Sequence, residues 1–206
     1  MATPRRMVYM KTASSYVVQF LQRPHSLPLV LSMFVLVTWI SLRMHVTRPS
    51  FPTNSTTKDD IKANVVRFHS RTPVIAKDNR GWLLHPLSLA SASHISGGAV
   101  TCASIHVGEI RPGMLRGNHR HLDCNETLVI WGAATKFRLE NNEVPDNGYA
   151  EVIIGSDDVA VATSPSGIAH ALVNIDQIRS TFFIGCQDSI INYNASSTDF
   201  NVWKDL

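Results

Sequence analysis

The chain has 206 residues, which is enough for one domain of ordinary size and an extension. Its hydrophobic content of 44% and its 17% of charged residues are typical of a globular core and exclude a disordered chain. The formal net charge of +3 is unevenly distributed, because the residues before Asp59 include seven Lys or Arg and no acidic residue. The remainder carries 12 Lys or Arg against 16 Asp or Glu, a formal −4, which argues against nucleic acid as its partner.

The three cysteines, Cys102, Cys124 and Cys186, show no C-x-x-C spacing. An odd number at these spacings excludes a disulfide framework and a zinc ribbon, and it allows at most one disulfide. At least one free thiol is therefore expected.

Residues 26–42 form an uncharged apolar segment between Arg23 and Arg43. Its length is close to the minimum with which a helix spans a bilayer, and Trp39 lies near one end, where aromatic residues favour the interface. No small-residue cleavage pattern follows, which favours a retained signal anchor over a removed signal peptide. We therefore expect a transmembrane helix over 26–42 after a cytosolic tail over 1–25.

The basic N-terminal residues favour a single-pass type II membrane protein with a lumenal C-terminal domain, in the Golgi or another endomembrane compartment. The sequons at Asn54, Asn125 and Asn194 are compatible with that placement. We expect glycosylation of Asn54 and Asn194 and an unmodified Asn125. An N-terminus that lacks acidic residues and contains Arg and Ser is also compatible with a transit peptide, so another organelle membrane is the alternative location.

Residues 43–60 include prolines and a run of Ser, Thr and Asn, which predicts a stalk before a folded domain over 61–206. Short runs rich in Val, Ile, Thr and Phe then alternate with Gly, Pro, Asn and Asp clusters, without helical periodicity beyond about two turns. The predicted strands are 64–68, 99–107, 127–131, 135–139, 149–154, 159–163, 170–175 and 181–185. This pattern predicts an all-β sandwich, jelly roll or small barrel.

The stretch from Gly113 to Glu126 carries the first candidate site. His119 and His121 are two residues apart in a β-type region, so both point to the same face of a strand. Glu126 can join them from the next strand, and two imidazoles with one carboxylate suit a divalent transition metal. On this stretch alone, the alternative is a pair of surface histidines in a polar turn.

A second stretch, from Pro165 to Asn174, offers a fourth ligand. A Pro–Gly turn leads into a strand whose first same-face position is His170. A lone histidine there is commonly a core or rim residue. Together with the first stretch it gives three His and one Glu, with room for water or substrate.

The two stretches resemble the two signature motifs of the cupin superfamily. In the first, Gly113, His119, His121 and Glu126 have the family's spacing, and Gly132 follows after five residues in place of six. In the second, the matching residues are Pro165, Gly167, His170 and Asn174, whereas Val159 replaces the family's leading glycine. The resemblance implies a single-domain jelly-roll barrel with a divalent metal (Zn, Mn or Fe). Its implied ligands are His119, His121, Glu126 and His170.

Residues from about 99 to 174 are also similar to RmlC-like cupins. These include the C-terminal cupin domain of bacterial capsular-polysaccharide enzymes and the dTDP-4-dehydrorhamnose epimerases. The chain departs from the capsular enzymes, because an apolar segment stands where they have a reductase domain. The arrangement of the whole chain is most similar to plant membrane-anchored RmlC-like cupins. The resemblance implies a sugar-type ligand, substrate binding by Arg116 and Arg138, and a homodimer.

Three functions remain open at this point. The first is a metal-dependent epimerase or isomerase of a sugar or nucleotide sugar. The second is a non-catalytic cupin that binds carbohydrate or supports a complex, and the third is a metal-dependent dioxygenase. Epimerisation needs a base, and the candidate is His106, which is otherwise interpreted as an ordinary strand histidine.

Overall fold

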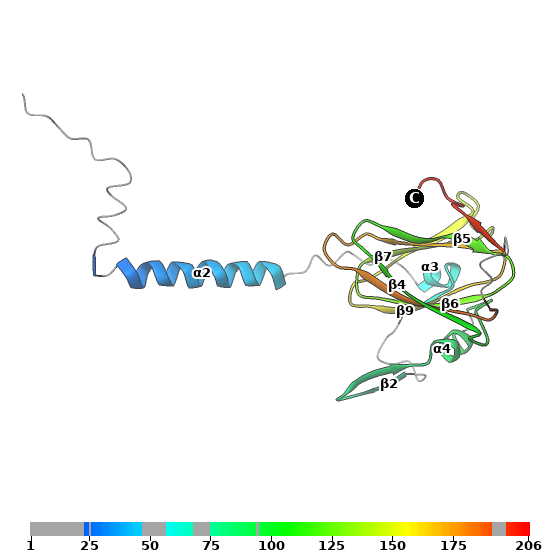
Figure 1. The fold of residues 1–206 in the computed structure, drawn as a ribbon, viewed down its shortest axis with the longest axis horizontal. Helices are drawn as coiled ribbons and strands as arrows, with labels where there is room; N and C mark the ends of the chain where they lie inside the picture. Colours follow the sequence, from blue (N-terminus) through cyan, green and yellow to red (C-terminus); the bar gives the residue numbers. More distant parts are fainter. Residues whose placement is uncertain (1–22, 25, 47–56, 68–74, 94, 191–196) are drawn as a thin grey trace, which may run out of the picture. The chain divides into compact units, whose positions relative to one another are not determined.

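The computed structural model describes residues 23–24, 26–46, 57–67, 75–93, 95–190 and 197–206 (Figure 1). Contacts within the chain divide it at Pro49 into two units, each considered by itself. The described part of the first unit consists mainly of helix α2 (Ser26–Val46). The second unit contains the β-strands and two short helices.

Helix α2 confirms helical structure in the apolar segment, but the predicted transmembrane anchor over 26–42 is not supported. In the described part of the chain, no helix combines the length and the apolar character needed to cross a membrane.

Ten strands of the second unit form two antiparallel sheets that stack as two layers (Figure 1). Sheet I has the order β1 (Val65–Arg67), β9 (Val159–Ser164), β6 (Glu126–Trp131), β11 (Thr181–Gln187) and β4 (Ser104–Ile110). Sheet II has the order β12 (Thr198–Phe200), β5 (Leu115–His121), β10 (Ala169–Asn174), β7 (Thr135–Glu140) and β8 (Tyr149–Ile154). Neighbouring strands are mostly distant in sequence, as in a jelly roll, which confirms the all-β prediction.

The main core lies between the two sheets and is built from alternate positions of their strands. Leu128 and Ile130 of β6 face Phe137 of β7 and Leu172 of β10, and all four side chains are fully buried. The barrel interior also buries polar side chains, such as Thr135 and Asn174 at one end and Glu126 and His170 at the other. The apolar core therefore holds the sheets at a fixed separation beside these polar side chains.

A second apolar cluster lies on the outer face of sheet I, where helix α4 (Pro86–Ala92) covers β6 and β9 (Figure 1). Proline in the first turn suits the start of a helix, and Leu89 packs with Val129 and Val161. The hairpin of β2 (Ile75–Asp78) and β3 (Gly81–Leu84) precedes α4. These elements and helix α3 (Thr57–Lys62) were not predicted, because each is too short for a periodic signal.

A disulfide joins Cys102, just before β4, to Cys186 in β11. Cys124 is a buried free thiol. Both observations confirm the prediction of at most one bridge and at least one free cysteine. The bridge ties the start of the edge strand β4 to its only neighbour in sheet I.

Candidate metal centre

The structure brings together the four residues predicted to be metal ligands. His119 and His121 lie at the end of β5, Glu126 is the first residue of β6, and His170 lies in β10. One potential ligand atom from each lies within 4.8 Å of the other three. Three imidazoles and one carboxylate from both sheets thus converge at one end of the barrel interior.

A β-bulge in β5 determines which side chains of that strand face the cluster. His119 lies opposite His170, but Arg116 lies opposite Leu172, so two residues of β5 face Ala171 alone. The extra residue is accommodated at Gly117, which has a φ of +72°. Because directly opposed residues share a face of the sheet, the bulge puts Arg116 on the same inner face as His119.

Glu126 is the electrostatic centre of the cluster. Its side chain is 1% exposed, and its Oε2 lies 3.2 Å from His170 Nε2 and 3.4 Å from His121 Nε2. Neither carboxylate oxygen accepts an aligned hydrogen bond from a described residue. Burial by itself would raise the pKa of Glu126, but the imidazoles of His106 and His121 outweigh it and hold the pKa well below its usual range. A buried, ionised carboxylate without hydrogen bonds is unfavourable unless a cation accompanies it.

The neighbouring imidazoles are suited to donate lone pairs to such a cation. Burial, followed by the proximity of His170 and His121, lowers the pKa of His119 to about 3. Burial also lowers the pKa of His170. Both rings are therefore neutral near pH 7, the state in which histidine ligates metal ions.

A hydrogen bond at the back of His170 sets its tautomer. The Ser164 hydroxyl donates to the Ile168 carbonyl over 3.0 Å, so its oxygen is left to accept from His170 Nδ1, 3.1 Å away. We therefore assign the proton to Nδ1, and the Nε2 lone pair faces Glu126 Oε2. A lone pair and a carboxylate oxygen at this distance repel each other unless a cation lies with them, so the residues fit a divalent metal.

Two further polar residues hold His121. Gln187 of β11 is buried and its Nε2 lies 3.1 Å from His121 Nε2, and Thr198 of β12 lies 3.4 Å from Nδ1. The sequence analysis singled out neither of them, nor Ser164. Only the pairing of β12 with β5 and of β11 with β6 brings them to the site.

A cavity of about 950 Å³ is lined by none of the four clustered residues but reaches them through His106. Its lining includes Arg116, Phe183 and His106, whose Nε2 lies 3.1 Å from Glu126 Oε1. His106 therefore belongs to the site and is not an isolated strand histidine. Arg116 is exposed, and no ion pair with a described residue occupies its guanidinium. Another cavity, of about 660 Å³, lies beside α4.

Arg138, the second predicted substrate-binding residue, lies elsewhere. It is opposite Ala171 in the sheet, and hence on the outer face of sheet II, away from His170. Its guanidinium is 4% exposed, pairs with Glu151 and Asp205 over 2.9 Å each, and lies 4.0 Å from the centre of the Tyr149 ring. These contacts tie the C-terminal segment to β7 and β8, and substrate binding by Arg138 stays a prediction.

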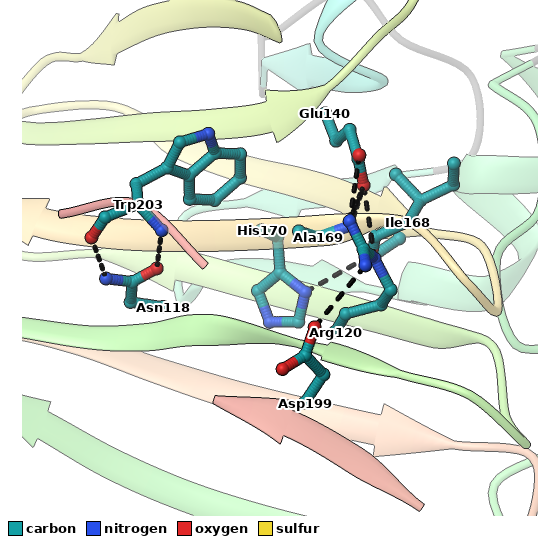
Figure 2. A network of polar contacts seen from close by, with 9 residues as sticks. Asn118, Arg120, Glu140, Ile168, Ala169, His170, Asp199 and Trp203 are labelled. Atoms are coloured by element: carbon teal, nitrogen blue, oxygen red, sulfur yellow. Dashed lines mark hydrogen bonds and ion pairs between the residues drawn. The ribbon is translucent and has the colours of Figure 1, made fainter. Parts of the chain in front are cut away.

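The outer face of β5 is held by a polar network (Figure 2). Arg120 pairs with Glu140 over 2.8 Å and with Asp199 over 3.4 Å, and the same Glu140 accepts the Ala169 N–H. Asn118 exchanges two hydrogen bonds with the backbone of Trp203. The network anchors β5 between β10 and the C-terminal segment, which keeps His119 and His121 directed inward.

The side chain of Asn125 is fully engaged. Its amide donates to Asp188 over 2.8 Å, and its carbonyl accepts the Ser166 N–H over 3.0 Å. These bonds hold the loop before β6, and the expectation that this sequon is unmodified stays a prediction. Asn54 and Asn194, the predicted glycosylation sites, lie outside the described residues.

The sequence matches no protein-family model and no curated protein. Among solved structures, the chain is similar to the capsular polysaccharide assembling protein CapF of Staphylococcus aureus (23% identity, TM-score 0.42) over 48% of this chain and 26% of CapF. It is also similar to the rmlC epimerase of Mycobacterium tuberculosis (15%, 0.44), over 63% and 65% of the two chains. A third similar structure is the dTDP-4-dehydrorhamnose 3,5-epimerase of Elizabethkingia anophelis (13%, 0.47), over 66% and 79%. The chain thus spans about a quarter of the length of CapF.

Proposed function

We propose that the second unit is a metal-binding cupin that acts on a sugar or nucleotide sugar as an epimerase or isomerase. The observation that carries the metal is the buried Glu126 carboxylate, which lacks hydrogen bonds and faces neutral imidazoles. The residues that would hold the ion are His119, His121, Glu126 and His170. The substrate class rests on the sequence resemblance to RmlC-like cupins.

The residues around the cluster suit an anionic, sugar-sized ligand. A divalent ion would supply Lewis acidity toward a carbonyl or hydroxyl oxygen. Arg116 would bind a phosphate or carboxylate group, because its inward-facing guanidinium has no competing carboxylate among the described residues. His106 lines the same cavity and is the candidate for the base that epimerisation requires. The cavity volume of about 950 Å³ is large enough for a nucleotide sugar.

Metal analysis of the purified full chain tests the first part of this proposal. We expect close to one divalent ion per chain, and loss of that ion in His119→Ala and His170→Ala. Retention of stoichiometric metal by both variants would refute the assigned ligand set. The measured metal also separates the alternatives, because iron would favour the dioxygenase.

Incubation with a panel of nucleotide sugars in deuterated water tests the second part. Solvent deuterium at C3 or C5 of the sugar would support epimerisation, and Arg116→Ala should reduce the exchange strongly. Binding without exchange would instead support the non-catalytic carbohydrate-binding module.

We further propose that the domain resides in an oxidising compartment. The Cys102–Cys186 disulfide supports this placement, because disulfides persist in secretory compartments and are reduced in the cytosol. Protection of both cysteines from alkylation in protein from intact cells would agree with it. Labelling of both thiols under the same conditions would contradict it.

A further inference from the structure

His106 contacts the candidate metal ligands from outside their cluster. It lies on β4, the edge strand of sheet I, and its Nε2 is 3.1 Å from Glu126 Oε1. The other carboxylate oxygen, Oε2, faces His170 and His121. The two oxygens of Glu126 therefore have different partners, and His106 lies beside the oxygen that is turned away from those two histidines.

A glycine leaves the space through which His106 reaches Glu126. Gly185 of β11 lies directly opposite His106. A Cβ atom at Gly185 would lie 2.2 Å from His106 Nε2 and 2.5 Å from Glu126 Oε1. The φ of Gly185 is outside the left-handed region, so the backbone does not require glycine at this position. The space does, because any side chain at 185 would exclude the contact between His106 and Glu126.

Strands β4 and β11 contain a second pair in which an aromatic ring lies over a glycine of the neighbouring strand. Phe183 of β11 lies opposite Gly108 of β4, and a Cβ atom at Gly108 would lie 2.3 Å from the Phe183 ring. The rings of His106 and Phe183 then meet edge to face, with their centroids 5.9 Å apart. Each ring lies over a glycine of the other strand and packs against the other ring, which fixes the position of the imidazole.

We propose that His106 is a positioning residue of the metal centre. Held by Gly185 and Phe183, its imidazole fixes the Glu126 carboxylate so that Oε2 is presented to the clustered histidines. Carboxylates that ligate metals are themselves held by surrounding groups, whose loss typically weakens metal binding about 10- to 100-fold. This inference rests on the metal centre of the proposed function.

The position of His106 also couples the cavity to the metal ligands. Its side chain is 35% exposed and lines the cavity of about 950 Å³, whereas Glu126 behind it is buried. A molecule in the cavity would therefore contact the ring that orients a ligand carboxylate.

Titration of the full chain with Co²⁺ tests this role, with the dissociation constant and the visible absorption spectrum as readouts. We expect His106→Ala and Gly185→Ala each to weaken Co²⁺ binding about 10- to 100-fold and to change the spectrum. His106→Gln should recover part of the affinity, because a carboxamide at this position can lie beside Glu126 Oε1 as the imidazole does. Ile105→Ala, on the exposed outer face of the same strand, is the matched control and should bind as the wild type does.

The outcomes separate this inference from the metal centre itself. Absence of Co²⁺ binding by the wild type, or wild-type binding by His119→Ala, would refute the metal centre. If His119→Ala does not bind Co²⁺ but His106→Ala has the affinity and spectrum of the wild type, only the role of His106 is refuted. Thermal melting of the metal-free variants identifies one that fails to fold, in which case His106→Gln decides.

Discussion

Two charged clusters lie on opposite faces of sheet II, and they differ in how their charges are satisfied. On the outer face, the Arg138 guanidinium meets two carboxylates and two aromatic rings. On the inner face, three histidines of sheet II face the Glu126 carboxylate of sheet I, which accepts no aligned hydrogen bond from the described residues. The outer cluster is electrostatically complete and joins parts of the chain. The inner cluster offers its carboxylate no Lys or Arg partner among the described residues, as expected of a site that binds a cation.

Glu126→Gln should have the largest effect on this contrast. The carboxamide keeps the shape but removes the negative charge, so we expect metal affinity to fall by more than about 100-fold, beyond the loss of an outer-shell partner. Metal content after dialysis against a Zn²⁺ buffer measures it. Glu109→Gln, a cavity-lining carboxylate outside the cluster, should keep its metal. Equal metal content in Glu126→Gln and Glu109→Gln would show that the charge of Glu126 does not distinguish the inner cluster from the outer one.

Arg138→Met should produce the opposite result. It leaves Glu151 and Asp205 without their shared cation, and we expect the free energy of unfolding to fall by about 1–3 kcal/mol. Metal content should stay unchanged, because Arg138 lies on the other face of the sheet. Urea denaturation measures the stability. A loss of sugar binding or turnover at unchanged stability would instead establish the predicted substrate-binding role.

The stability of the metal-free protein should decrease as the pH falls below about 6.5. His119 and His170 have lowered pKa values when folded, so the unfolded chain takes up protons that the folded chain does not. Each group contributes at most about 1.4 kcal/mol per pH unit, and for His119 the effect extends to a pH of about 3. Urea midpoints measured in EDTA between pH 7.5 and 5 test it. His119→Gln should make the decrease of stability with falling pH less steep. A steeper decrease in this variant would contradict the lowered pKa of His119 in the folded protein.

Ser164→Ala should have the smallest effect, at about a tenfold loss of metal affinity. The hydroxyl holds the His170 proton on Nδ1, and without it the ring can place that proton on Nε2, which faces the site. Competition with a chelator of known affinity measures the change, and Ser164→Thr, which keeps the hydroxyl, is the control. Equal losses in both variants would point to packing and not to the tautomer.

The candidate site was predictable from sequence where its residues belong to local patterns. His119 and His121 share a strand face because of their spacing, and the Pro–Gly turn before His170 marks the start of a strand. The elements between residues 75 and 92 were missed because four-residue strands and a seven-residue helix give no reliable periodic signal. The anchor predicted over 26–42 is not supported, and a length at the lower limit does not by itself distinguish a spanning helix from another apolar helix.

The sequence by itself determined the all-β class, the four clustered residues and the limit of one disulfide, because these depend on spacing and alternation along the chain. Only the tertiary structure decided the rest. A bulge at Gly117 turned Arg116 inward, against simple alternation from His119. Pairing of strands distant in sequence gave His106, Ser164 and Gln187 their places beside the ligands and sent Arg138 to the opposite face. Such placements depend on register between strands, and register is fixed by the packing of the whole barrel.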